Sequence, residues 1–237
     1  MENQKINKYV SEGFTQVQGW VEPEIFEFLD FLSKHVSRGK GVVEIGIHHG
    51  QFFFGLRALL PSPELSVAID VFEHQQEYNI DQSGWGNLEI FSDNIKKYDP
   101  HLGENIEIIV GDSTLGANVE KLKSMVSSVR YISIDGGHTR NHVMHDLYTA
   151  ESIISEDGVI IVDDFLHPHW LGVTDGTIEF ISRGTSIVPF AIGYNKLYMC
   201  KLSSHKKFYE AIENSKFKHE EEFIQGCKLW TVYQIGR

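Results

Sequence analysis

Short apolar runs rich in β-branched residues alternate with longer stretches of mixed polarity through the middle of the chain. The apolar runs cover residues 41–45, 66–71, 106–110, 131–134 and 158–162. Continuous apolar runs of this length are typical of strands buried in a parallel sheet. The stretches between them, near 51–60, 87–98, 115–126 and 140–155, are long enough for crossover helices. The pattern predicts an α/β fold with a doubly wound, mostly parallel sheet.

Both ends of the chain depart from this alternation. Residues 22–36 have apolar positions at helical spacing, and residues 1–20 are polar with isolated aromatics that we expect to form a flap or arm. The runs 186–193 and 196–202, joined by Tyr194-Asn195, predict a C-terminal antiparallel hairpin. We therefore expect an N-terminal arm and helix (1–37), a central domain (38–202), and a C-terminal helix and tail (203–237). The apolar stretch 229–233 either packs on its own domain or pairs with a second subunit of a homo-oligomer.

Charge and composition narrow the class of protein. The 33 acidic and 21 basic residues give a formal net charge of −12, which disfavours a nucleic-acid partner. The sequence has neither the apolar segment of about 18 residues that spans a membrane nor a signal-peptide pattern at its start. Two cysteines without metal-ligand spacing suit a reducing compartment. We expect a soluble, cytoplasmic protein without a membrane partner.

A glycine-containing turn follows the first predicted strand. It runs from Glu44 through Gly46 to Gly50, and such glycines let the backbone approach a ligand closely. Twenty residues after Gly50, Asp70 ends the next apolar run, where a carboxylate can accept hydrogen bonds from ribose hydroxyls. The third run ends at Asp112 and Ser113. Three strand ends thus carry polar groups at the sheet edge where ligands of open α/β sheets bind.

This pattern resembles that of class I S-adenosylmethionine-dependent methyltransferases, over roughly residues 38–202, and the resemblance implies a Rossmann-like fold. It also implies cofactor-binding roles. Glu44 and the loop from Gly46 to Gly50 would flank the methionine portion, Asp70 would hold the ribose, and Asp112 with Ser113 would lie by the adenine. A nicotinamide enzyme is disfavoured because the Gly-x-Gly-x-x-Gly fingerprint is absent.

A second set of polar residues follows the last two parallel strands. Asp135 ends one strand, and Asp163 and Asp164 end the next, so we expect the three carboxylates to converge beside the cofactor. They would repel one another unless a cation lay between them, and Mg²⁺ prefers such oxygen ligands. In the alternative interpretation, one aspartate caps the following loop and the other is solvated.

The stretch also resembles metal-dependent sugar and natural-product O-methyltransferases of the macrocin O-methyltransferase type, which have an Asp-Gly pair and a later Asp-Asp pair. Gly137 and the nearby histidines depart from that type and are closer to general bacterial methyltransferases in which metal use varies. The sequence therefore predicts an Mg²⁺ site at Asp135, Asp163 and Asp164 and leaves the need for the metal open.

Histidines gather around this predicted site. His138 directly follows the Asp-Gly-Gly turn, and we expect it to act with Asp135 in catalysis, as general base toward an acceptor hydroxyl. His142 and His145 either join it or merely share a helix face with it. The loop 165–176 is expected to build the acceptor pocket, with Trp170 stacking on the acceptor or anchoring the loop. Residues 75–85 are a candidate lid.

These observations predict S-adenosylmethionine-dependent methylation of a hydroxyl on a small molecule such as a sugar or natural product. Three alternatives stay open. An N-methyltransferase would need a base but no metal, a metal-dependent hydrolase would use the aspartates, and a binding module would hold the cofactor without chemistry.

Overall fold

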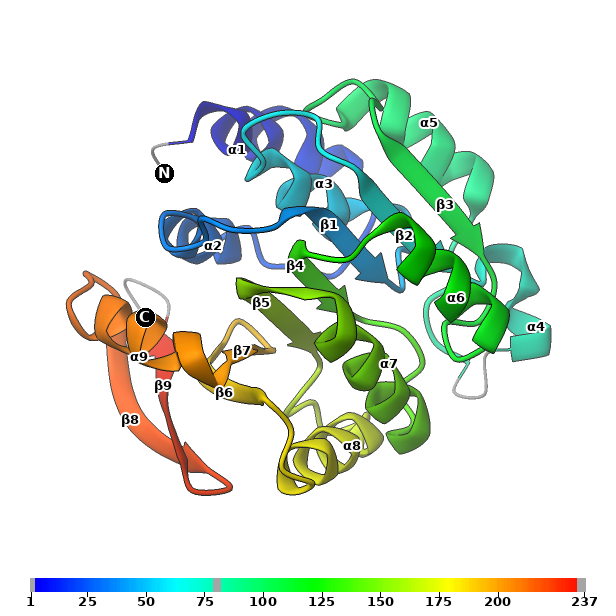
Figure 1. Ribbon diagram of the computed structural model, residues 1–237. Coiled ribbons are helices and arrows are strands. Elements are labelled where there is room, and N and C mark those ends of the chain that lie inside the picture. The colour runs from blue at the N-terminus through cyan, green and yellow to red at the C-terminus, as the bar shows by residue number, and fades with distance from the viewer. Residues whose placement is uncertain (1–2, 79–81, 234–237) are drawn as a thin grey trace.

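One mixed sheet runs through the part of the chain that the structure, a computed structural model, describes, namely residues 3–78 and 82–233 (Figure 1). The strand order is β3-β2-β1-β4-β5-β7-β6-β9-β8. The first five strands are β1 (Lys40–Ile45), β2 (Ser66–Asp70), β3 (Ile106–Val110), β4 (Val129–Ile134) and β5 (Ile154–Asp163). All four pairings among them are parallel, which confirms the predicted fold class and the Rossmann-like arrangement.

The C-terminal part of the sheet is mostly antiparallel. Strands β6 (Ile187–Gly193) and β7 (Lys196–Lys201) form the predicted hairpin, and β7 also pairs with β5. Tyr194 and Asn195 at its turn both have positive φ, at 55° and 61°, as a two-residue type I′ turn requires. The sheet continues past residue 202 with a second hairpin, β8 (Lys218–Ile224) and β9 (Cys227–Tyr233), where only a helix and tail were expected. The stretch 229–233 packs on its own domain, because β9 pairs with β6.

Helices cover both faces of the sheet (Figure 1). They are α1 (Gln4–Lys8), α2 (Ile25–Ser33), α3 (Gln51–Ala58), α4 (Gln75–Tyr78), α5 (Leu88–Tyr98), α6 (Gly116–Met125), α7 (Arg140–Ile153), α8 (Leu171–Ser182) and α9 (Leu202–Glu213). Two buried clusters result. One joins the N-terminal residues with α2, α3, α5 and α9, and the other joins α6, α7 and α8 across the opposite face. Burial on two faces explains why the central strands are continuously apolar.

The N-terminal residues belong to the core, which corrects the expectation of a flap. Tyr9, Phe14 and Val17 are buried, and the Tyr9 hydroxyl donates to the carbonyl of Gln51 at 2.6 Å. The Gln51 amide in turn donates to the carbonyls of Phe14 and Val17. These bonds fix the segment on α3 and bring residues 18–21 to the ends of the parallel strands.

Helix α8 lies where the sequence was expected to form an irregular loop. Glycines at 172 and 176 lower its intrinsic helix propensity, but tertiary packing requires them. A Cβ at Gly172 would lie 2.5 Å from the carbonyl oxygen of His138, and one at Gly176 would lie 2.6 Å from that of Arg140. The glycines therefore let α8 pack tightly against the segment that carries His138.

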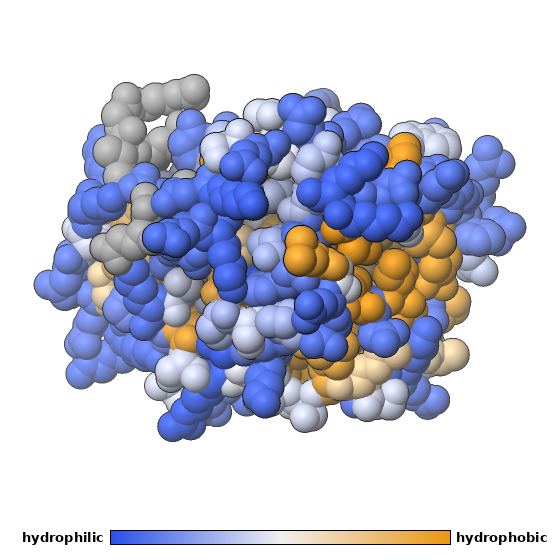
Figure 2. Space-filling view, turned by 90° about the horizontal axis from the view of Figure 1, so that it is seen from above, coloured by the Kyte–Doolittle hydropathy of each residue, from blue (hydrophilic) through white to orange (hydrophobic). Residues whose placement is uncertain are grey.

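The surface is mixed in character. Seen from above, it is largely hydrophilic, and hydrophobic residues gather on the side where α5 and β3 lie (Figure 2). Strand β3 ends the sheet on that side, and Val110 at its end is 42% exposed. No helix in the described ranges is long and apolar enough to cross a membrane.

Candidate functional site

A cavity of about 550 Å³ opens at the carboxyl ends of the parallel strands. It is lined by residues predicted from the sequence at five strand ends, namely Glu44, Gly46, Asp70, Asp112, Ser113, Asp135, His138, Asp163 and Asp164. The two predicted constellations therefore share one cavity. Of the predicted cofactor residues, Gly50 does not line the cavity; it is the N-cap of α3, with φ at +93°.

The loop between β1 and α3 is shaped by Asp70. Its Oδ2 accepts hydrogen bonds from the backbone N–H groups of Ile47, at 2.6 Å, and His48, at 2.8 Å. Its Oδ1 accepts from the N–H of Phe72 at 2.6 Å. Burial raises the pKa of Asp70, against these three bonds, which lower it. Asp70 thus organises the loop, and its carboxylate keeps acceptor capacity toward the cavity.

Gly46 is required where β1 approaches β4. Its φ is +85°, and a Cβ there would lie 1.8 Å from the carbonyl oxygen of Asp135. The N–H of Asp135 donates to the carbonyl of Ile45 at 2.8 Å, so the two strand ends are bonded together. This contact holds the Gly46 loop against the turn that carries Asp135.

Glu44 is buried at the floor of the cavity. Its Oε2 atom is buried and has no hydrogen-bond partner among the described residues. Burial and the charge of Asp135 raise the pKa of Glu44 well above its usual range. A buried carboxyl without a partner is costly, so this position favours a cationic or hydrogen-bond-donating ligand group.

Asp112 and Ser113 form the far wall of the cavity together with His142. Asp112 Oδ1 accepts from the N–H and the hydroxyl of Thr114, both at 2.8 Å, and its Oδ2 lies 3.7 Å from His142 Nε2. Thr139, the N-cap of α7, contacts His142 Nδ1 at 2.7 Å. His142 therefore lines the cavity. Helical spacing alone does not distinguish this from merely sharing a helix face with His138.

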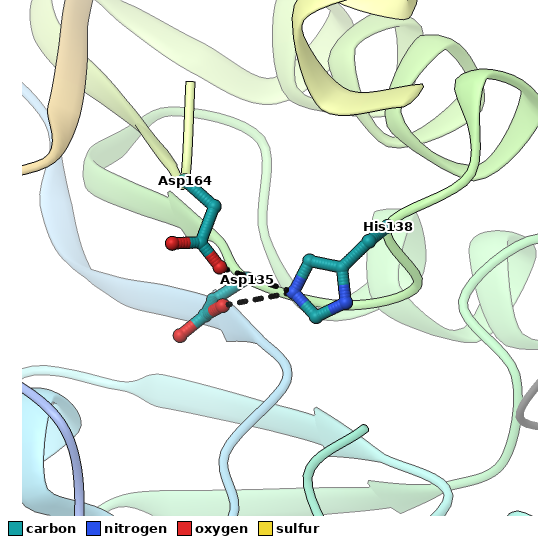
Figure 3. Close-up of side chains that lie close together, drawn as sticks. All are labelled: Asp135, His138 and Asp164. Carbon is teal, nitrogen blue, oxygen red and sulfur yellow. Dashed lines mark ion pairs between the residues drawn. The ribbon is translucent and has the colours of Figure 1, made fainter. Parts of the chain in front are cut away.

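Two aspartates, Asp135 and Asp164, face the same nitrogen of the His138 ring (Figure 3). Its Nε2 is 3.4 Å from Asp164 Oδ2 and 3.9 Å from Asp135 Oδ1, and the three ligand atoms lie within 4.8 Å of one another. Its Nδ1 contacts the Ser83 hydroxyl at 3.0 Å. The ring stacks on Trp170, with centroids 4.3 Å apart. His138 is thus oriented from several sides, and Trp170 contacts it directly instead of only anchoring the loop.

The three carboxylates of the predicted metal set have different partners. Asp163 is the register partner of Lys196, and its Oδ2 lies 2.5 Å from Lys196 Nζ, so it is held in an ion pair. Asp164 Oδ1 accepts from the Asn195 amide at 2.5 Å. Asp163 also shares a side-chain hydrogen bond with Asp135. The residues whose possible ligand atoms all lie within 4.8 Å of one another are Asp135, His138 and Asp164.

Charge and burial set the protonation of these groups. Burial and the charge of Asp163 raise the pKa of Asp135 to about 8, against the His138 bond and the Lys196 charge, which lower it. Burial acts to raise the pKa of Asp164, but hydrogen bonds from His138 and Asn195 bring it below its usual value. Burial and contacts within the chain thus act in opposite directions on the pKa values of both aspartates.

Several lining residues escaped the sequence analysis. Trp20 is 74% exposed and stacks on His48, with ring centroids 4.7 Å apart. Ser83, from the predicted lid, and Asn195 also line the cavity. Residues 79–81 of that lid lie outside the described residues. In the sequence, the signal for Trp20 is an aromatic residue next to a glycine, and Ser83 lies in the predicted lid, whereas Asn195 is brought here by tertiary structure alone.

The profile of a family described as methyltransferase domain matches residues 43–165, just over half of the chain. A search of curated proteins found no match.

Solved structures share the fold at low sequence identity. An O-methyltransferase from Bacillus cereus, in complex with SAH, is 18% identical, with a TM-score of 0.57 over 84% of this chain and 90% of that chain. The O-methyltransferase NovP is 15% identical, with a TM-score of 0.60 over 76% and 80%. The O-methyltransferase TomG from Streptomyces achromogenes, in complex with SAM, is 15% identical, with a TM-score of 0.53 over 84% and 89%.

Proposed function

The chain belongs to the family of methyltransferase domains, and on this premise we propose that it transfers the methyl group of S-adenosylmethionine to a hydroxyl of a small molecule. One observation carries the proposal. A single cavity joins the Gly46 loop and Asp112, where a nucleoside cofactor fits, to an oriented histidine, His138. Similar solved O-methyltransferases, two of them described in complex with SAM or SAH, support the choice of cofactor and of oxygen as acceptor.

The polar groups of the cavity match the parts of the cofactor. Glu44 Oε2, which has no partner among the described residues, would receive the amino group of the methionine portion. The remaining acceptor capacity of Asp70 would bind the ribose hydroxyls, and Asp112 with Ser113 would bind the adenine edge. The cofactor supplies a methyl group on a sulfonium, whose sulfur is a good leaving group.

His138 is placed to take the proton of the acceptor. With Nε2–H donated to Asp164, the lone pair is on Nδ1, which faces Ser83. We propose that an acceptor hydroxyl replaces the Ser83 hydroxyl as the partner of Nδ1. As the hydroxyl oxygen bonds to the methyl carbon, the carbon–sulfur bond breaks, its electron pair stays on sulfur, and the proton passes to Nδ1.

Positioning provides most of the acceleration in such an in-line transfer. Trp170 holds the imidazole plane by stacking, and Asp164 holds its orientation through Nε2. Trp20 and Trp170 line the cavity and help to exclude water from the reacting atoms. Asp163, one of the three carboxylates expected to hold Mg²⁺, is paired with Lys196. No step of this mechanism therefore passes through a metal ion.

A transfer assay tests the proposed function. Purified protein is incubated with methyl-labelled S-adenosylmethionine and a panel of phenols, catechols, sugars and matched amines. We expect label in hydroxylated acceptors, and loss of transfer in His138→Ala. Transfer to the amines alone would replace the proposal with N-methylation, and hydrolysis of an ester without the cofactor would replace it with a hydrolase.

A further inference from the structure

Lys196 is a buried cation placed among the carboxylates of the site. It begins β7, directly after the hairpin turn, and is 3% exposed. Its Nζ lies 2.5 Å from Asp163 Oδ2 and 4.6 Å from the centroid of the Phe52 ring. An ion pair on one side and a cation–π contact on the other fix the ammonium in place.

The buried ammonium lies among carboxyl groups. Those of Asp163, Asp135 and Glu44 all interact electrostatically with it. Lys196 therefore acts electrostatically on three carboxyl groups around the floor of the cavity.

Repulsion among Asp135, Asp163 and Asp164 would favour a metal ion between them if they had no other partners. In the structure each of them has a partner within the chain. Asp163 has Lys196, Asp164 has His138 and Asn195, and Asp135 faces His138 and shares a side-chain hydrogen bond with Asp163. A divalent ion bound by Asp135, His138 and Asp164 would also occupy the His138 Nε2 that orients the ring, and it would be repelled by the ammonium.

We propose that Lys196 is a built-in counter-cation that takes the place of a divalent metal ion, so that methyl transfer at this site is independent of metal. This inference rests on the proposed function for its catalytic part. Lys196 is a positioning residue in this scheme, because it acts on the reacting groups through Asp163 and the neighbouring carboxyls.

Metal binding and metal dependence test the proposal together. Wild-type protein, extensively chelated, is titrated with Mn²⁺ by calorimetry, and its labelled methyl transfer is measured with chelator and with added Mg²⁺ or Mn²⁺. We expect no saturable Mn²⁺ binding below millimolar concentration and unchanged transfer in chelator. Transfer that is lost on chelation and restored by Mg²⁺ would overturn the proposal.

Variants at the ion pair separate a charge effect from a packing effect. Lys196→Met keeps the length of the side chain and frees Asp163, so this variant should gain Mn²⁺ binding and at least about tenfold stimulation of transfer by Mn²⁺. Lys196→Arg keeps the charge and should stay metal-independent. The double variant Lys196→Met with Asp163→Asn should bind no Mn²⁺. A folded Lys196→Met protein that gains no Mn²⁺ binding would contradict the counter-cation role.

Different results would rule out the proposed methyl transfer and the counter-cation role of Lys196. If Lys196→Met does not fold, as judged by its melting curve, the chelation of wild-type protein still decides the question. Absence of S-adenosylhomocysteine binding would remove the proposed function, whereas the Mn²⁺ titration needs neither cofactor nor acceptor and would still report on Lys196.

Discussion

His138 is the residue on which the chemistry depends most directly. Replacing it with Ala removes the proton acceptor and should lower kcat by about 100-fold or more, while the affinity for S-adenosylhomocysteine stays nearly unchanged. Ser83→Ala is the matched control, because it removes only the hydroxyl that contacts Nδ1 and should change kcat little. Equal losses in the two variants, measured in the labelled-transfer assay, would argue against the role of His138 as base.

Asp157 makes stability depend on pH at a point away from the cavity. Burial acts to raise its pKa, but donors from Ser37, Arg38 and Lys207 lower it to about 2. Because the folded-state pKa lies below the unfolded value of about 3.9, the stabilisation is full above that value and is lost as pH falls toward 2. Asp157→Asn should therefore lower the free energy of unfolding by about 1–3 kcal/mol at pH 7.

Denaturant unfolding at several pH values checks this prediction. The difference between wild-type and Asp157→Asn proteins should shrink as pH falls from 4 to 2. A difference that stays constant over this range would show that Asp157 acts through packing and not through its charge.

At the residue scale, the sequence predicted which polar groups reach the cavity better than it predicted their partners. Asp70, Asp112 and Asp135 line the cavity because each ends a strand that the apolar runs make recognisable. The pairing of Asp163 with Lys196 depends on the register between β5 and β7, which lie far apart in the sequence. The spacing of residues in the sequence does not predict that register, so the sequence did not identify Lys196 as the partner of Asp163.

Among the elements, α8 has the most specific packing requirement. Gly172→Ala would place a Cβ 2.5 Å from the carbonyl oxygen of His138, so it should cost about 1–3 kcal/mol of stability and also reduce transfer by shifting His138. Gly116→Ala in α6 is the control, because a Cβ there meets nothing within 4 Å and should be neutral or stabilising. Thermal melts and the transfer assay, run on both variants, distinguish the two effects.

The sequence predicted the elements whose pattern of apolar and polar residues matches their burial in the fold. Strands β1, β2, β4 and the second half of β5 are buried on both faces and are therefore largely apolar. Helix α8 was missed because its glycines serve contacts with α7 and weaken its own pattern. Strand β8 was missed because it is a mostly exposed edge strand whose run Glu220 to Glu222 is acidic, so it lacks the apolar pattern of a buried strand.

At the scale of the whole molecule, the second hairpin completes the core that supports the sheet. Trp230 in β9 stacks on Tyr209, with centroids 4.6 Å apart, and its Nε1 donates to the Tyr209 carbonyl at 3.0 Å. Trp230→Ala should lower the free energy of unfolding by about 3 kcal/mol without weakening S-adenosylhomocysteine binding, because Trp230 does not line the cavity. Phe223→Ala on the exposed side of the hairpin should change stability little. A large loss of ligand affinity in Trp230→Ala would show that the hairpin shapes the site.

Calorimetric titration with S-adenosylhomocysteine shows whether the cavity at the strand ends binds the cofactor. Protein freed of copurified ligand should bind one equivalent with micromolar affinity, and Glu44→Gln should weaken binding by about tenfold or more at an unchanged melting temperature. No detectable binding by the folded wild-type protein, or equal binding by Glu44→Gln, would contradict the account of this cavity.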